Sequence, residues 1–184
     1  MTNLDPLLER NRAFATTGAH TGLSMMPNQP IFVVTCLDPR VDPAAFLGVG
    51  LGDAPVVRNA GGRITDAVID DIAFISYLAG TILGDGPLFE VAVIHHTNCG
   101  TGFLANPTFR AAFAARTGLD ESALAAEAVI NPDETVSADV ERLLASPKVS
   151  ERITAAGYVY DLDSGLVRMV VPPAQPRPAQ QAER

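Results

Sequence analysis

The stretch "IFVVTCLDPR", residues 31–40, places a run of mostly β-branched apolar residues directly before three chemically active side chains. A continuous apolar run of this kind is typical of a strand that is covered on both faces, as the strands of parallel sheets are. Cys36, Asp38 and Arg40 follow the run at alternate positions. They therefore stand at the carboxyl end of a buried strand, where open α/β sheets bind their ligands.

A second stretch, "VIHHTNCG" at residues 93–100, repeats this arrangement. The apolar run 88–94 predicts another buried strand, and His96 and Cys99 follow it closely. Between the two strands, apolar residues recur at helical intervals over 66–78, which predicts a crossover helix. A strand, helix, strand order makes the strands parallel, so both polar segments are expected at one edge of the sheet.

The remaining patterns predict an α/β fold with a mostly parallel central sheet flanked by helices, an N-terminal helical arm and a C-terminal edge hairpin. Residues 1–171 are expected to form one domain, in which 1–30 are the arm and an extended connection, and the proline-rich 172–184 to be a disordered tail. The other expected elements are a helix capped by Asp5, a short helix capped by Asp42, a strand over 55–58, a crossover helix ending near Gly80, helices over 108–116 and 134–145, and a hairpin over 158–171.

Composition narrows the class of protein. The chain has 184 residues, which suits one domain, and a formal net charge of −8 argues against a nucleic-acid partner. It contains no apolar run long enough to span a bilayer and no pattern typical of a secretory signal, so no membrane partner is expected. We therefore expect a cytoplasmic protein, whose two cysteines are free thiols.

Two sulfurs and one imidazole gathered at strand ends offer three ligands to a metal ion, and zinc is the commonest ion with this preference. Three protein ligands leave one open position, as in catalytic zinc sites, where a bound water can reach a pKa of about 7 and act as hydroxide. The plainer interpretation is that the cysteines only pack in the core.

Three motifs, in this order, carry a resemblance to a known family: CxDxR at Cys36, Asp38 and Arg40, "RNAGG" at residues 58–62, and HxxCG at His96, Cys99 and Gly100. With them, the chain resembles the β-class carbonic anhydrases, from the "LLERNRAFA" arm to the hairpin near Val171. The resemblance covers nearly the whole chain.

The resemblance implies a Rossmann-like fold and one zinc ion per chain, held by Cys36, His96 and Cys99. It implies a lyase in which zinc-bound hydroxide hydrates carbon dioxide reversibly to bicarbonate, with Asp38 and Arg40 as a catalytic dyad. It also implies a homodimer, or a higher even oligomer, in which the N-terminal helix embraces the partner. Two thiolate ligands should make the bound water less acidic than three neutral imidazoles would. A carboxylate that orients the water would compensate for this, and Arg40 would keep that carboxylate ionised and off the metal.

The same residues are also compatible with other functions. The short "NAGG" and "HHT" variants resemble the branch of the family that contains carbonyl sulfide hydrolases, and carbon disulfide is a similar linear substrate. A non-catalytic zinc or redox site is a second possibility, against which the presence of Asp38 and Arg40 argues. A dinucleotide loop at "GVGLGDAP" is disfavoured because it follows a helix and precedes a strand.

More specific roles can be expected for several residues near the proposed ligands. We expect Arg58 and Asn59 to brace the loop beneath the metal, and Gly61 and Gly62 to let the backbone pass close to it. We expect His95 to point away from His96 and to pack in the core. The segment "TGFLANP" after Cys99 is expected to line the approach to the metal. His20 is a surface histidine or a proton relay. No role is assigned to Gln29, nor to Asn98, which stands where members of the family commonly have aspartate.

Overall fold

A computed structural model describes residues 2–176. Its centre is a five-stranded sheet in the order β2-β1-β3-β4-β5, in which only β5 runs antiparallel to its neighbour. The strands are β1 Ile31–Cys36, β2 Val56–Asn59, β3 Glu90–His96, β4 Thr154–Tyr160 and β5 Val167–Ala174. The predicted α/β fold, with its mostly parallel sheet and its edge hairpin, is confirmed.

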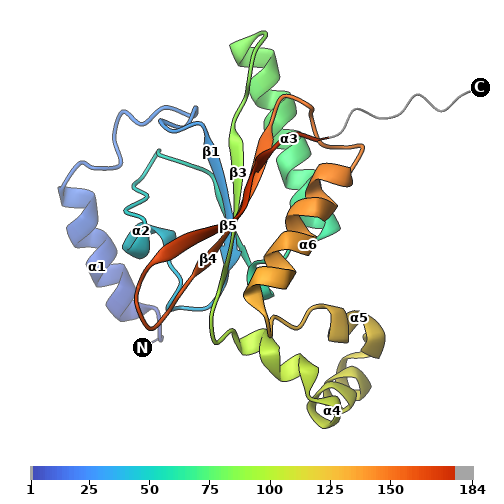
Figure 1. The fold of residues 1–184 in the computed structure, drawn as a ribbon. Helices are drawn as coiled ribbons and strands as arrows, with labels where there is room; N and C mark the ends of the chain where they lie inside the picture. Colours follow the sequence, from blue (N-terminus) through green and yellow to red (C-terminus); the bar gives the residue numbers. More distant parts are fainter. Residues whose placement is uncertain (1, 177–184) are drawn as a thin grey trace, which may run out of the picture.

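Helices cover the two faces of the sheet unequally (Figure 1). The helices are α1 Asp5–Thr16, α2 Pro43–Phe46, α3 Asp66–Leu83, α4 Pro107–Thr117, α5 Glu121–Ala126 and α6 Pro132–Ala145, with 3₁₀ turns η1 Ala60–Gly62 and η2 Gly100–Ala105. The long helices α3 and α6 pack on one face and bury the main core. The other face carries the short α2, while α1 stands away from the sheet.

The core follows from the apolar runs seen in the sequence. Val34, Val91 and Val93 of the strands pack with Ile72 of α3 and Leu143 of α6, and all five are fully or almost fully buried. Burial of side chains of this size contributes about 1.5–3 kcal/mol each. Loops, not α3 or α6, surround the carboxyl ends of the parallel strands. No helix within residues 2–176 is long and apolar enough to cross a membrane.

Three sequence expectations were wrong at element boundaries. Asp5 lies inside α1, whose N-cap is Leu4. Helix α3 continues past Gly80 to Leu83 and ends at Gly84, whose φ of 69° is favourable only for glycine. Strand β5 extends to Ala174, so the expected tail does not begin at Pro172.

The extension of β5 has a physical reason. Pro172 and Pro173 lie on an edge strand, between Val171, which pairs with Gly157, and Ala174, which pairs with Ala155. The ladder has a register irregularity at this point, where a missing N–H is tolerated. Residues 177–184 of the expected tail lie outside the described residues.

Gly62 permits the closest backbone approach beneath the carboxyl edge of the sheet. Its φ is 70°, in the left-handed region that favours glycine. A Cβ atom at this position would lie 2.9 Å from the carbonyl carbon of Thr35 and 3.0 Å from the nitrogen of Cys36. The expectation that glycine is needed here is confirmed, because any side chain would push η1 away from β1.

Gly62→Ala should lower the free energy of unfolding by about 3 kcal/mol, the sum of the left-handed backbone cost and of overpacking against fixed backbone atoms. Gly165→Ala is the matched control, because Gly165 has φ of 72° but open space around its missing Cβ. It should lose only about 1 kcal/mol. Urea unfolding monitored by circular dichroism measures both, and equal losses would contradict the close-approach argument.

Candidate metal centre

The parallel pairing of β1 and β3 brings Cys36 and His96 together. Thr35 of β1 is the register partner of Ile94 of β3, and the Thr35 hydroxyl donates to the Ile94 carbonyl at 2.9 Å. Cys36 and His96 end their strands just beyond this pair. Cys99 joins them from the following loop, so that one ligand atom from each of the three residues lies within 4.8 Å of the others.

The two cysteines are free thiols, as expected, with sulfurs 3.9 Å apart. Val129 packs against both of them in a small buried cluster. The contact between the two sulfurs lowers the pKa of Cys99 and raises the pKa of Cys36. A cation placed between the two sulfurs would favour the ionised form of both.

The imidazole of His96 is oriented for a ligand. Its Nδ1 lies 2.9 Å from the carbonyl oxygen of Thr97, which can only accept, so Nδ1 carries the proton. The Nε2 atom is thus left as an acceptor, fully buried and without a hydrogen-bond partner among the described residues. Metal-ligating histidines commonly have this arrangement, with the second nitrogen fixed by a backbone carbonyl. The donor set of two sulfurs and one unpartnered imidazole nitrogen fits zinc.

Asp38 and Arg40 form an ion pair beside this cluster. Arg40 donates from Nε to Oδ1 at 2.9 Å and from Nη2 to Oδ2 at 2.7 Å, and its backbone N–H also donates to Oδ1. The Arg40 guanidinium holds the pKa of Asp38 down at about 2. The side chain of Asp38 is 11% exposed and that of Arg40 49%, so the pair opens to solvent on the arginine side.

Arg40 also explains part of the role of Asn98. Its Nη2 donates to the backbone carbonyl of Asn98 at 3.0 Å, which links the loop after β1 to the loop after β3. Asn98 has φ of 53°, the single positive value for a residue other than glycine within residues 2–176. Asparagine and aspartate both tolerate this conformation. The backbone of Asn98, not its side chain, makes the contact.

Arg58 braces the loop beneath the ligands, as expected. Its guanidinium donates to the carbonyl of Cys36 at 3.0 Å and to that of Asp38 at 2.7 Å. Asn59 ties the η1 turn, because its amide donates to the Arg63 carbonyl and its side-chain oxygen accepts from the Arg63 N–H, both at 2.8 Å. The carboxyl ends of β1 and β2 are thereby fixed against each other.

Cys36 and Cys99 line a cavity of about 380 Å³. The walls are largely apolar, and the lining residues include Cys36, Asp38, Cys99, Thr101, Leu104, Phe109 and Phe113. The segment after Cys99 lines this approach, as expected. Phe109 and Phe113 belong to α4 and their part in the cavity was missed, although aromatic residues spaced along one helix were a signal of an apolar wall.

His95 points away from the cavity into the core, as expected, and there it meets a residue that was missed. Its Nε2 donates to Asp139 of α6 at 3.1 Å, and its Nδ1 lies 2.9 Å from the hydroxyl of Thr135. Arg63 pairs with the same carboxylate at 2.7 Å. Burial opposes ionisation of Asp139, but the hydrogen bonds from His95 and Arg63 outweigh it and lower its pKa.

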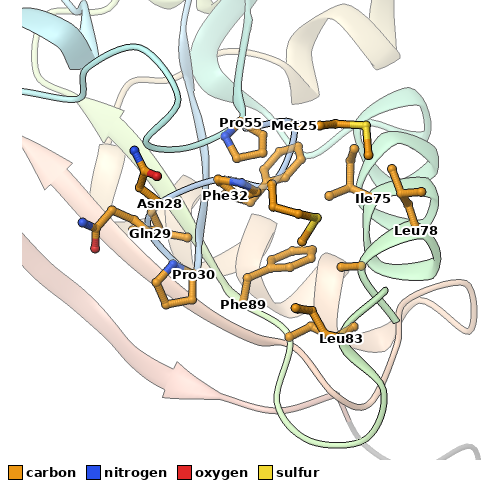
Figure 2. A pocket seen from close by; sticks show the side chains of 15 residues that line it. Met25, Asn28, Gln29, Pro30, Phe32, Pro55, Ile75, Leu78, Leu83 and Phe89 are labelled. Atoms are coloured by element: carbon orange, nitrogen blue, oxygen red, sulfur yellow. The ribbon is translucent and has the colours of Figure 1, made fainter. Parts of the chain in front are cut away.

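Gln29 and His20 do not line the metal cavity of their own chain. Gln29 borders a different cavity, of about 280 Å³, between the N-terminal connection, the starts of β1 and β3, and α3. Figure 2 shows Phe32 and Phe89 inside it and the amide of Gln29 turned outward. The residues that line it carry no ionisable group, so it offers no side-chain acid or base for catalysis.

Comparisons with known proteins agree with this geometry. The carbonic anhydrase family model matches residues 31–106, which contain Cys36, His96 and Cys99 as well as Asp38 and Arg40. Beta-carbonic anhydrase 1 of Mycobacterium tuberculosis is 32% identical over 172 residues, covering 94% of this chain and 100% of that protein. The chain belongs to the β-carbonic anhydrase family.

Other relatives define the breadth of this family. The crystal structure of carbonic anhydrase from Streptococcus mutans matches with a TM-score of 0.78 and 32% identity, over 92% of this chain and 98% of that chain. Carbon disulfide hydrolase from Acidithiobacillus thiooxidans is 27% identical over 161 residues, 77% of each protein. This chain is therefore similar to enzymes that are named for two different substrates.

Proposed function

We propose that this β-carbonic anhydrase family member is a zinc-dependent hydro-lyase that converts carbon dioxide and water reversibly to bicarbonate and a proton. The observation that carries the proposal is the buried donor set: two sulfurs 3.9 Å apart that line an apolar cavity, and an unpartnered imidazole nitrogen close to them. Cys36, His96 and Cys99 would hold one zinc ion per chain. Bound there with one open position, zinc would lower the pKa of a water molecule toward neutrality.

The residues of the chain itself would supply orientation. Asp38 stays ionised because of Arg40, so its carboxylate can accept a hydrogen bond from water in the cavity but cannot donate one. Arg40 occupies both carboxylate oxygens and thereby holds Asp38 away from the donor cluster. Leu104, Phe109 and Phe113 give the cavity an apolar wall, which suits a linear, uncharged substrate.

The alternative is hydrolysis of carbonyl sulfide or carbon disulfide with release of hydrogen sulfide. The apolar wall of the cavity suits this alternative equally, because carbonyl sulfide and carbon disulfide are linear and uncharged like carbon dioxide. The similarity to carbon disulfide hydrolase supports it as well. The same donor set and the same Asp38–Arg40 pair would serve either substrate.

We also propose that two copies of the chain associate through α1. This helix has no buried residue, and Leu4, Leu7 and Leu8 are 53%, 50% and 41% exposed. Figure 1 shows α1 standing apart from the sheet. A helix of this length is marginal by itself in water, and an apolar stripe at helical spacing favours burial against a partner. A second copy is the partner that the resemblance implies.

The substrate can be decided by a side-by-side assay of the zinc-loaded protein. We expect stopped-flow measurements to give rapid hydration of carbon dioxide and slow release of hydrogen sulfide from carbonyl sulfide and carbon disulfide. Rapid sulfide release with feeble hydration would support the alternative. Bound zinc without either activity would favour a structural or redox site, and Cys36→Ser should abolish zinc binding in every case.

Asp38→Asn should lower turnover at least about 100-fold, because the amide cannot provide the charged acceptor that orients the attacking water. Zinc content, measured by atomic absorption, should remain that of the wild type. Asp70→Asn is the control. Asp70 lies on α3, and its exposed carboxylate pairs with Lys148. Wild-type turnover in Asp38→Asn would refute the assigned role.

Replacement of Leu7 and Leu8 by serine should convert the dimer into monomers of 19.4 kDa, as measured by sedimentation equilibrium. The loss of the apolar stripe removes the contact area that the second copy needs. The control pair Glu9→Ser with Arg12→Ser breaks an exposed ion pair on the same helix and keeps the net charge. A wild-type protein that sediments as a monomer would contradict the proposed association.

A further inference from the structure

Asp139 of α6 is a buried carboxylate outside the metal cavity. It is 2% exposed, and it accepts four hydrogen bonds. Arg63 donates to it from Nε at 2.7 Å and from Nη2 at 3.1 Å, His95 donates at 3.1 Å, and the backbone N–H of Ile64 donates at 3.2 Å. A buried charge with this many donors is expensive to disturb, because removal of one partner leaves the others unsatisfied.

The first connection from Asp139 to the metal centre runs through β3. His95 immediately precedes the ligand His96, and strand geometry points the two rings to opposite faces. The contacts of His95 with Asp139 and Thr135 fix the end of β3 against α6. The direction of the His96 ring is therefore set partly by contacts on the opposite side of the strand.

The second connection runs through η1. Arg63 follows this turn directly, and Asn59 bonds both its N–H and its carbonyl at 2.8 Å. Gly62, between them, is packed against the backbone of Thr35 and Cys36. A shift of Arg63 would therefore move the floor beneath the ligand Cys36.

The third connection runs through the segment after α5. The Nη1 of Arg63 donates to the carbonyl of Ala126 at 2.7 Å. Three residues later, Val129 packs on both sulfurs, and its N–H donates to the hydroxyl of Thr101 at 3.3 Å. That hydroxyl lies 3.3 Å from the sulfur of Cys99. The guanidinium thus holds the segment that covers the thiol pair.

We propose that Asp139 is a positioning residue for the metal centre, acting through Arg63 and His95 on the supports of all three ligands. It touches none of the ligands itself. The inference rests on the proposed metal site and adds a single buried carboxylate that couples its three supports. Its consequence is that loss of the charge on Asp139 loosens the donor set even though every ligand is present.

The test compares Asp139→Asn with Asp133→Asn. Asp133 lies on the same helix and also pairs with an arginine, Arg168, at 2.6 Å, but on the surface. Outer contacts of metal ligands typically contribute about 10–100-fold to metal affinity. Asp139 acts one contact further out, so we expect zinc affinity, measured by chelator competition, to fall by about 10-fold in Asp139→Asn, the lower end of this range. The absorption spectrum of the Co²⁺ form should change, and both readouts should be unchanged in Asp133→Asn.

Arg63→Lys keeps the test decisive if Asp139→Asn does not fold. Lysine keeps the charge beside Asp139, but its ammonium cannot reproduce the fork that reaches both Asp139 and Ala126. Folded Arg63→Lys should bind zinc more weakly than the wild type and show an altered Co²⁺ spectrum. Wild-type zinc affinity and spectrum in the folded variants would overturn this inference alone, whereas a wild-type chain that takes up no zinc would contradict the proposed function as well.

Discussion

The register of one parallel strand pair fixes the geometry of the whole site. Val33 to Thr35 of β1 pair with Ala92 to Ile94 of β3, so the two strands end at the same edge with Cys36 and His96 just beyond the last pair. Because successive side chains alternate between faces, a slip of one residue would turn a ligand away from the cluster. The same apolar runs that bury the core therefore align the donors, and the stability of the sheet and the geometry of the site share one cause.

The strands and the connections have different tasks around this edge. Strand ends supply two ligands, while the turns after them supply the supports, namely η1 beneath Cys36 and the loop that carries Cys99 and Asn98. The wall of the cavity comes from a third source, η2 and α4, which follow Cys99 in the chain. Substitutions in α4 can thus alter the shape of the cavity while the donor set keeps its contacts with β1 and β3. This separation is consistent with a family whose members are named for different substrates.

The sequence predicted the elements whose signals are local and missed those that depend on distant contacts. The apolar runs of β1 and β3, the Asp42 cap and the hairpin were all readable, and so was the meeting of Cys36, His96 and Cys99. Helix α5 was missed because its six residues carry no strong periodicity. Asp139 was missed because it looks like a surface residue of α6 until Arg63, distant in sequence, folds against it. Buried charge pairs of this kind are properties of tertiary structure and have no local signature.

Geometry, more than energy, accounts for the arginine at position 40. An ion pair in which Arg40 is 49% exposed contributes little to stability, because water screens the charges. Its planar fork nevertheless occupies both oxygens of Asp38 and also reaches the Asn98 carbonyl, which the single ammonium of lysine could not do with the same directions. The carboxylate is therefore kept charged and in a fixed direction next to the two cysteine sulfurs. The planar guanidinium of Arg40 keeps the Asp38 carboxylate from rotating toward the two sulfurs. The carboxylate and the sulfurs can therefore remain close to one another.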